Sequence, residues 1–163
     1  MVGATPEDLA RVKPLLDAMG KQTLHCGGPG AGMSMKLINN LLALSILAVD
    51  LEALAMGLQA GLKPDVMLQV LRSTFADNRR LHTLVPDKIL KGDHAPGFKV
   101  ALAAKDAGLA VAYASSLRVP IWTMGQVRHL LSQVLAQGKG EQAHTVLATA
   151  LEEIIGRRFS EWQ

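Results

Sequence analysis

The sequence predicts a mainly α protein: a helical bundle around one long buried helix, preceded by a short β-α-β segment. The first observation is a helical pattern from about Gly32 to Ala60, in which residues 41–49 are apolar except for Ser45. A helix that is apolar on every side is a buried helix. The second is that aromatic residues make up only 4% of the chain while Ala, Leu, Val and Met fill the apolar positions. That composition favours helix-on-helix packing over sheets.

Length and composition indicate how many domains the chain forms and which kinds of partner are not expected. A chain of 163 residues is expected to form one compact core, and a formal charge of +3 argues against nucleic acid as the main partner. Cys26 is the only cysteine, and the five histidines fall at no metal-ligand spacing, so neither a disulfide nor a metal site is expected. Residues 1–6 lack the features of a signal peptide, and the apolar run at 41–49 is shorter than the roughly 20 residues of a membrane span. We therefore expect a cytoplasmic protein with no membrane contact.

The first 31 residues differ from the rest. Residues 1–4 resemble the end of a strand, and Thr5 and Pro6 begin a helix that should run to Met19, with Pro14 as a kink and Gly20 as its end. Residues 22–26 form a second candidate strand. Because one or two short strands do not make a stable sheet alone, we expect residues 1–31 to be the remnant of a truncated N-terminal domain with its linking turn. Residues 32–163 then form the helical domain.

The remaining elements are predicted to be helical. Loops are expected at 74–78 and 92–97, and residues 157–163 should be a polar tail. The predicted helices cover residues 64–73, 79–91 (bent or divided at Pro86), 98–117, 123–136 and 141–155.

The glycine-rich turn at Gly27–Gly32 precedes the long helix. Its spacing is not that of the dinucleotide fingerprint Gly-x-Gly-x-x-Gly, and Leu37 stands where a phosphate-binding loop would need Ser or Thr. Two interpretations remain: a tight turn that allows close packing, or a turn that also lets a substrate approach the backbone.

Two polar pairs interrupt apolar helices. Lys36 and Asn40 are four residues apart and so share a helix face. They are either surface residues or a partly desolvated amine that exchanges a proton with a substrate oxygen while the amide holds that oxygen. Lys105 and Asp106 follow Phe98 in an alanine-rich helix. They are either a solvated edge, or a ligand-binding lysine beside an aspartate that anchors its helix.

A run of basic residues could face an anionic ligand or be solvated, and the sequence favours solvation. Its members are Arg72, Arg79, Arg80, Lys88 and Lys91.

In combination, three motifs resemble those of one family. They are the glycine turn with Lys36-Leu37-Ile38-Asn39-Asn40, the helix segment 50–55, and Phe98 followed by Lys105-Asp106. In order and spacing they are similar to the C-terminal half of the β-hydroxyacid dehydrogenases, the group containing 3-hydroxyisobutyrate dehydrogenase, tartronate semialdehyde reductase and 6-phosphogluconate dehydrogenase. The resemblance covers residues 1 to about 155.

This resemblance implies an N-terminal Rossmann domain, of which residues 1–27 would be the last β-α-β piece. The dinucleotide fingerprint and a substrate-binding serine-glycine segment would lie upstream, so the fragment alone should be inactive. The full-length protein would be an NAD- or NADP-dependent oxidoreductase acting on a small 3-hydroxy acid or its semialdehyde. Phosphogluconate is disfavoured because the chain is too short for that enzyme's helical domain. A homodimer or homotetramer is implied.

The resemblance also assigns roles to single residues. Lys36 matches the catalytic lysine, a general acid/base, and Asn40 matches a residue that holds substrate oxygens. Gly30 matches a turn glycine at the substrate, and Lys105 a lysine near the nicotinamide. Asp106 is expected to be structural. The family commonly has Leu after Lys-Asp, where this chain has Ala107.

Two rival functions remain open at this point. One is a helical dimerisation or interaction module that kept the fold without the chemistry. The other is a helical DNA-binding domain that uses Arg79 and Arg80 as its contact surface.

Overall fold

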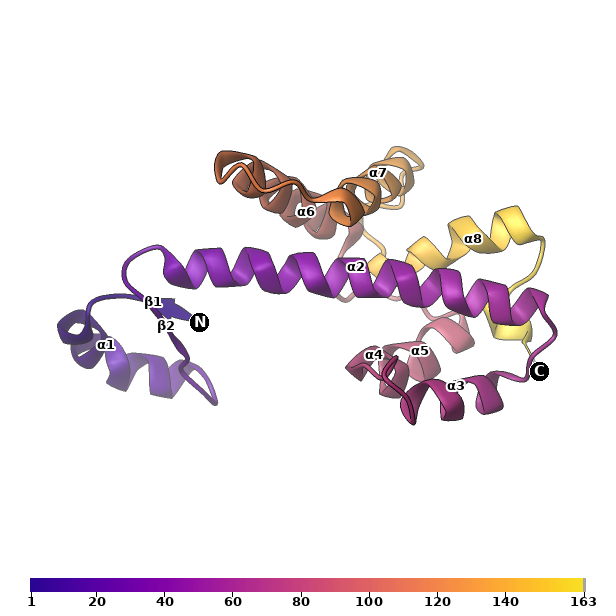
Figure 1. The fold of residues 1–163 in the computed structure, drawn as a ribbon, viewed down its shortest axis with the longest axis horizontal. Coiled ribbons are helices and arrows are strands. Elements are labelled where there is room, and N and C mark those ends of the chain that lie inside the picture. Colours follow the sequence, from indigo (N-terminus) through magenta and orange to yellow (C-terminus); the bar gives the residue numbers. More distant parts are fainter. Residues whose placement is uncertain (163) are drawn as a thin grey trace.

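A computed structural model describes residues 1–162. The chain forms a short parallel two-stranded sheet and a series of helices, several of them short (Figure 1). In order they are β1 (Val2–Gly3), α1 (Pro6–Met19), β2 (His25–Gly27), α2 (Ala31–Gln59), α3 (Pro64–Arg72), α4 (Arg79–His82), α5 (Leu84–Asp87), the 3-10 turn η1 (Ile89–Lys91), α6 (Val100–Ser116), α7 (Trp122–Ala136), η2 (His144–Val146), α8 (Leu147–Ile155) and η3 (Phe159–Glu161).

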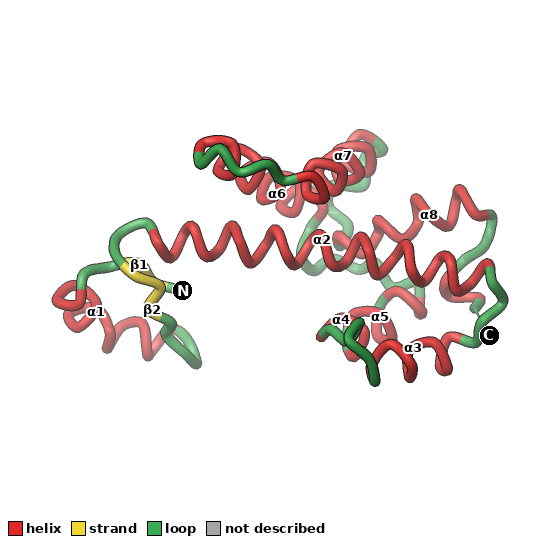
Figure 2. The backbone as a smooth tube through the Cα atoms, viewed as in Figure 1, coloured by secondary structure: helices red, strands yellow, loops and turns green. Residues whose placement is uncertain are grey.

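Helix α2 is the element that the others pack against. Helices α6 and α7 lie along one side of it, α8 packs on its C-terminal half, and α3–α5 lie on the opposite side from α6 (Figures 1 and 2). Its inward side chains Leu44, Leu47, Leu51, Leu54 and Leu58 are at most 1% exposed. Apolar side chains from these neighbouring helices join them in one core. The prediction of a mainly helical fold with one long helix is confirmed.

Burial of α2 on all sides is not confirmed. Among residues 1–162, α2 is the one helix long and apolar enough to cross a membrane, and half of its most apolar 18-residue window is buried within the fold. The described residues leave large apolar side chains of α2 exposed, most of them on the face opposite its buried leucines. They are Met33, Met35, Ile38, Leu42, Val49 and Met56.

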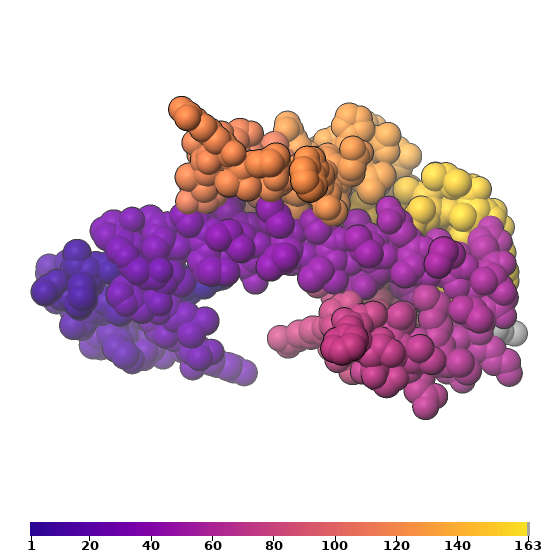
Figure 3. Space-filling view, in the orientation of Figure 1, coloured from indigo at the N-terminus to yellow at the C-terminus, as the bar shows by residue number. Residues whose placement is uncertain are grey.

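The N-terminal lobe, β1-α1-β2, sits at the other end of α2 from α8, and Figure 3 shows it standing apart from the α3–α5 region. Thr5 caps α1 by accepting a hydrogen bond from the Asp8 amide at 3.2 Å. The two strands pair in parallel and contact α2. Gly3 and Gly32 permit this contact, because a Cβ on Gly32 would lie 2.8 Å from the Gly3 nitrogen. The close-packing interpretation of the glycine turn is therefore confirmed.

Three predicted segments differ in detail. Residues 79–91 form three short pieces rather than one bent helix or two. Residues 141–143 are not helical, because their backbone pairs with residues 94–100 instead; the Val100 amide donates to the Gln142 carbonyl at 2.9 Å. The tail is not simply polar, since Phe159 is 1% exposed and the Trp162 indole donates to the Leu62 carbonyl at 2.6 Å.

We predict that Gly32→Ala loosens the N-terminal lobe from α2. The added methyl group would meet backbone atoms of residues 1–3, which cannot move aside as a flexible side chain does. An overpacking cost of about 1–3 kcal/mol should lower the hydrogen-exchange protection of the Ala4 amide by roughly 5- to 150-fold. That amide donates to the Gly27 carbonyl at 2.9 Å.

The matched control is Gly28→Ala in the same turn, where an added Cβ meets nothing within 4 Å. Equal protection of the Ala4 amide in the two variants would show that the Gly3–Gly32 contact does not hold the lobe.

Candidate functional site

Lys36 and Asn40 meet on the exposed early turns of α2, as their spacing predicts. The Lys36 Nζ donates a hydrogen bond to the Asn40 Oδ1 at 2.9 Å. Asn40 is 6% exposed, which is rare for a polar side chain unless it is fully hydrogen-bonded. Its neighbour Asn39 is exposed and donates to the same oxygen at 3.3 Å.

Asp106 holds the other end of the Asn40 amide. The Asn40 Nδ2 donates to the Asp106 Oδ2 at 2.6 Å, which joins α2 to α6. Lys105 lies beside the second oxygen of the same carboxylate, at 3.4 Å from Oδ1. The ammonium of Lys36 faces the amide oxygen of Asn40, and the carboxylate of Asp106 faces its amide nitrogen. A flipped amide would place its N–H groups toward the ammonium and its oxygen toward the carboxylate, so these two charges fix its orientation. Asp106 therefore anchors its helix, as the structural interpretation predicts.

A cavity of about 200 Å³ opens at this pair. Its polar wall is made by Lys36 and Asn40 on α2, Arg80 on α4 and His144 at the start of η2. Its remaining lining consists of Ala43, Leu44 and Phe98. We call this hollow the Lys36 cavity. An amine and an amide from α2, a guanidinium from α4, the Phe98 ring and the His144 imidazole thus converge from four segments that are far apart in the sequence.

His144 presents a neutral ring to the Lys36 cavity. Burial lowers its pKa, the hydrogen bond to the Phe98 carbonyl acts in the opposite direction, and the Arg80 charge adds to the lowering. The Nδ1 lies 3.1 Å from that carbonyl, which can only accept, so Nδ1 carries the proton. The neutral ring then has an acceptor lone pair at Nε2. Phe98 stacks edge-on against the same ring with centroids 5.2 Å apart.

The predicted site residues are only partly brought together. Lys36, Asn40, Asp106 and Lys105 form one connected group. Gly30 does not line the Lys36 cavity; it is the left-handed N-cap residue of α2, with φ of 91°. The expected desolvation of Lys36 is not found, because Lys36 is exposed among the described residues. Apolar neighbours on a helix shield a lysine only if another element covers them.

Sequence reasoning missed Arg80 and His144 as cavity residues. Arg80 was assigned to a solvated basic run, and most of that run is indeed used elsewhere: Arg72 donates to the Leu81 carbonyl, and Lys88 pairs with Asp93. No local pattern separates Arg80 from Arg79, because the distinction arises from the packing of α4 against α2.

A second hollow and possible metal-binding groups are the other candidates for a site. A larger hollow, about 570 Å³, lies between residues 92–94 and 149–161, away from Lys36. Its charges serve the fold: Lys139 pairs with Glu153 at 3.4 Å and Glu152 accepts from the Phe159 amide at 2.8 Å. Within residues 1–162 there is no group of three His, Cys, Asp or Glu residues that could hold a metal ion.

Comparison with known proteins identifies the family of the chain. The family described as "NAD-binding of NADP-dependent 3-hydroxyisobutyrate dehydrogenase" matches residues 30–151, which include the whole group around Lys36. The chain belongs to this dehydrogenase family. Its members among the relatives are NAD(P)-dependent oxidoreductases of small hydroxy acids and their aldehydes.

The chain spans about half the length of the curated relatives it matches. It is 37% identical to 3-sulfolactaldehyde reductase of Escherichia coli over 142 residues, covering 87% of this chain and 48% of that protein. It is 30% identical to 2-(hydroxymethyl)glutarate dehydrogenase of Eubacterium barkeri over 163 residues, covering 100% and 54%. Among solved structures it is similar to Mycobacterium tuberculosis 3-hydroxyisobutyrate dehydrogenase with L-serine, with a TM-score of 0.85, 25% identity, and coverage of 93% and 54%.

Proposed function

We propose that the full-length protein is an NAD(P)-dependent dehydrogenase of a small 3-hydroxy acid, or a reductase of its semialdehyde, with Lys36 as general acid/base. This chain would supply the substrate-side and oligomerisation domain. The observation that carries the proposal is the amine of Lys36, held 2.9 Å from Asn40 at the mouth of a cavity, with Asn40 itself held by Asp106.

The proposed chemistry divides between the cofactor and this chain. When bound, the nicotinamide accepts hydride from the carbon that carries the hydroxyl, or returns it to the aldehyde. The Lys36 amine accepts the hydroxyl proton in oxidation, and its ammonium returns that proton in reduction. Asn40 keeps the amine at the cavity, and because only one of its two N–H groups is used by Asp106, the other remains for a substrate oxygen.

The cofactor would be held mainly by residues outside this chain. Lys105 is the residue here that fits a role beside it, because its side chain is 61% exposed and so can reach a neighbouring anion while it lies next to Asp106. NAD and NADP both fit such a contact. We propose that the chain alone has no dehydrogenase activity and that the protein is cytoplasmic.

We predict that Lys36→Met in the full-length protein lowers kcat for oxidation of 3-hydroxy acids by about 10²–10⁴-fold, the usual contribution of a positioned acid/base. The measurement is NAD(P)H formation with 3-hydroxyisobutyrate. Lys63→Met is the control, since Lys63 is an exposed lysine at the start of α3. If Lys36→Met kept near-parental turnover, the catalytic assignment would be lost and the interaction-module alternative would be favoured.

We also propose that the exposed apolar stripe of α2 forms the contact between copies of the chain. Met35, Leu42, Val49 and Met56 recur every seven residues, close to two helical turns, and so lie along one side of α2. Beside them an apolar groove of about 430 Å³ runs between α2 and residues 71–81, next to the fully exposed Phe75. A continuous apolar surface of this kind is typical of an interface.

We predict that the full-length protein is a dimer or tetramer and that Val49→Glu together with Met56→Glu shifts it toward monomer. Two carboxylates placed on an apolar interface would be desolvated without partners. Sedimentation equilibrium or light scattering after gel filtration measures the mass. Leu15→Glu, on exposed α1, is the control. A mass that stays the same in the double variant would rule out this stripe as the interface.

A further inference from the structure

Arg80 places a second positive charge in the Lys36 cavity. It reaches the cavity from α4, on the side of α2 where α3–α5 lie, while Lys36 and Asn40 reach it from α2 itself. His144 also lines the cavity, and burial lowers its pKa, which favours the neutral ring. The two cations of this cavity are therefore a primary amine near the exposed mouth and a planar guanidinium on the opposite helix.

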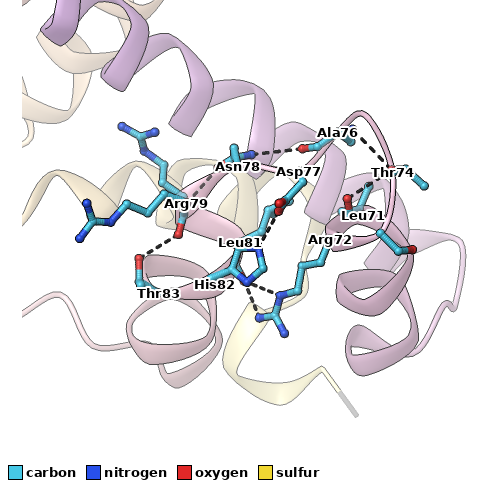
Figure 4. Close-up of polar contacts among 12 residues, drawn as sticks. Leu71, Arg72, Thr74, Ala76, Asp77, Asn78, Arg79, Leu81, His82 and Thr83 are labelled. Atoms are coloured by element: carbon cyan, nitrogen blue, oxygen red, sulfur yellow. Dashed lines mark hydrogen bonds and ion pairs between the residues drawn. The ribbon is translucent and has the colours of Figure 1, made fainter.

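Hydrogen bonds hold the short helix α4, which carries Arg80, and Figure 4 shows those from Arg72 to the Leu81 carbonyl and from Thr83 to the Arg79 carbonyl. Asn78 caps the helix by accepting from the Arg80 amide at 3.0 Å, and its Nδ2 donates to the Asp50 Oδ1 of α2 at 3.0 Å. Arg72 donates to the Leu81 carbonyl at 2.9 Å, which ties α4 to α3. These contacts hold the backbone of α4 in place, and from it the Arg80 side chain lines the Lys36 cavity.

The Arg80 side chain has no internal partner of its own. Among residues 1–162 its guanidinium forms neither an ion pair within 4 Å nor a side-chain hydrogen bond, whereas Lys88, Lys91, Lys99 and Lys139 all pair with carboxylates. Asp50 is the carboxylate that attracts it, and Asp50 is hydrogen-bonded to Asn78. Burial lowers the pKa of Arg80, and the Asp50 charge opposes that effect only in part. A half-buried guanidinium with open donors is suited to a planar bidentate anion.

We propose that Arg80 binds a second carboxylate of the substrate, so that the enzyme prefers hydroxy dicarboxylic acids over hydroxy monocarboxylic acids. The inference rests on the proposed function, because it places the reacting hydroxyl at Lys36 and the distal carboxylate at Arg80. In this inference Arg80 binds the distal carboxylate and so selects the substrate, and it takes no part in proton transfer. A carboxylate there would pair with the half-buried Arg80 charge and accept hydrogen bonds from its unused guanidinium donors.

The test compares three substrates in the full-length protein with NAD(P). They share a hydroxymethyl group on the carbon next to a carboxylate: 2-(hydroxymethyl)glutarate carries a carboxyethyl side chain, 2-(hydroxymethyl)pentanoate a propyl group, and 3-hydroxyisobutyrate a methyl group. The readout is kcat/KM for each in the parent protein, Arg80→Met, Arg80→Lys and Arg79→Met. Arg79 is the matched control because it is the exposed neighbour of Arg80 on α4 and does not line the cavity.

We expect the parent protein to prefer the dicarboxylate. Arg80→Met should lower kcat/KM for the dicarboxylate by about 10- to 150-fold, the effect of losing a hydrogen-bonded charge pair, and change the two monocarboxylates by less than about threefold. Arg80→Lys should retain part of the preference, and Arg79→Met all of it. If Arg80 had only a structural role, Arg80→Met would lower kcat/KM equally for all three substrates. That result would overturn the inference.

Two further outcomes separate this inference from the proposed function. If the parent protein oxidises the monocarboxylates and shows no preference for the dicarboxylate, the Arg80 role is wrong and the Lys36 role stands. If it oxidises none of the three hydroxy acids, the proposed function fails and the Arg80 role fails with it.

Discussion

The amide of Asn40 stands between an ammonium on its own helix and a carboxylate on α6, and the arrangement of the site depends on it. Without Asp106, the amide could rotate, and the one hydrogen bond that the Lys36 amine makes within residues 1–162 would lose its fixed direction. Without Asn40, the Asp106 carboxylate would keep only Lys105 at 3.4 Å on the other oxygen. Because the Asn40–Asp106 hydrogen bond joins the two helices, the same contact that orients the amine also ties α6 to α2.

Helix α2 serves the core and the site with different faces. Its leucines at 44, 47, 51, 54 and 58 are buried against the neighbouring helices, and its first turns carry Lys36 and Asn40. The glycines at 3 and 32 bring the N-terminal lobe against the start of this helix at backbone distance. A residue near the start of α2 is thus placed by the lobe on one side and by α6 on the other.

Much of the fold could be predicted because its signals are local. The N-cap at Thr5, the start at Pro6 and the long apolar run of α2 gave element bounds within a few residues. The errors have a non-local cause. Residues 141–143 have helical composition, yet they pair with residues 94–100, and Trp162 is buried because a distant carbonyl accepts its indole. Neither contact leaves a periodic pattern in the sequence.

The site residues also divide into those with a local sequence signal and those placed by contacts between distant segments. The i, i+4 spacing placed Lys36 beside Asn40, and the family resemblance pointed to Lys105 and Asp106. Arg80 and His144 could not be predicted, because they reach the Lys36 cavity only through the packing of α4 and η2 around α2. The exposed stripe on α2 was also missed, since an apolar pattern on all sides does not reveal which face the chain itself covers.

The most direct test of the central claim is a double-mutant cycle on Asn40→Ala and Asp106→Ala, with the free energy of unfolding of the chain measured in urea. The Lys105 contact is lost in both Asp106 variants and so cancels in the cycle. We predict a coupling energy of about 1.5–3 kcal/mol, as for a hydrogen bond to a charged group. A coupling below about 0.5 kcal/mol would mean that the two substitutions act independently, and that Asp106 does not hold the Lys36 amine in place through Asn40.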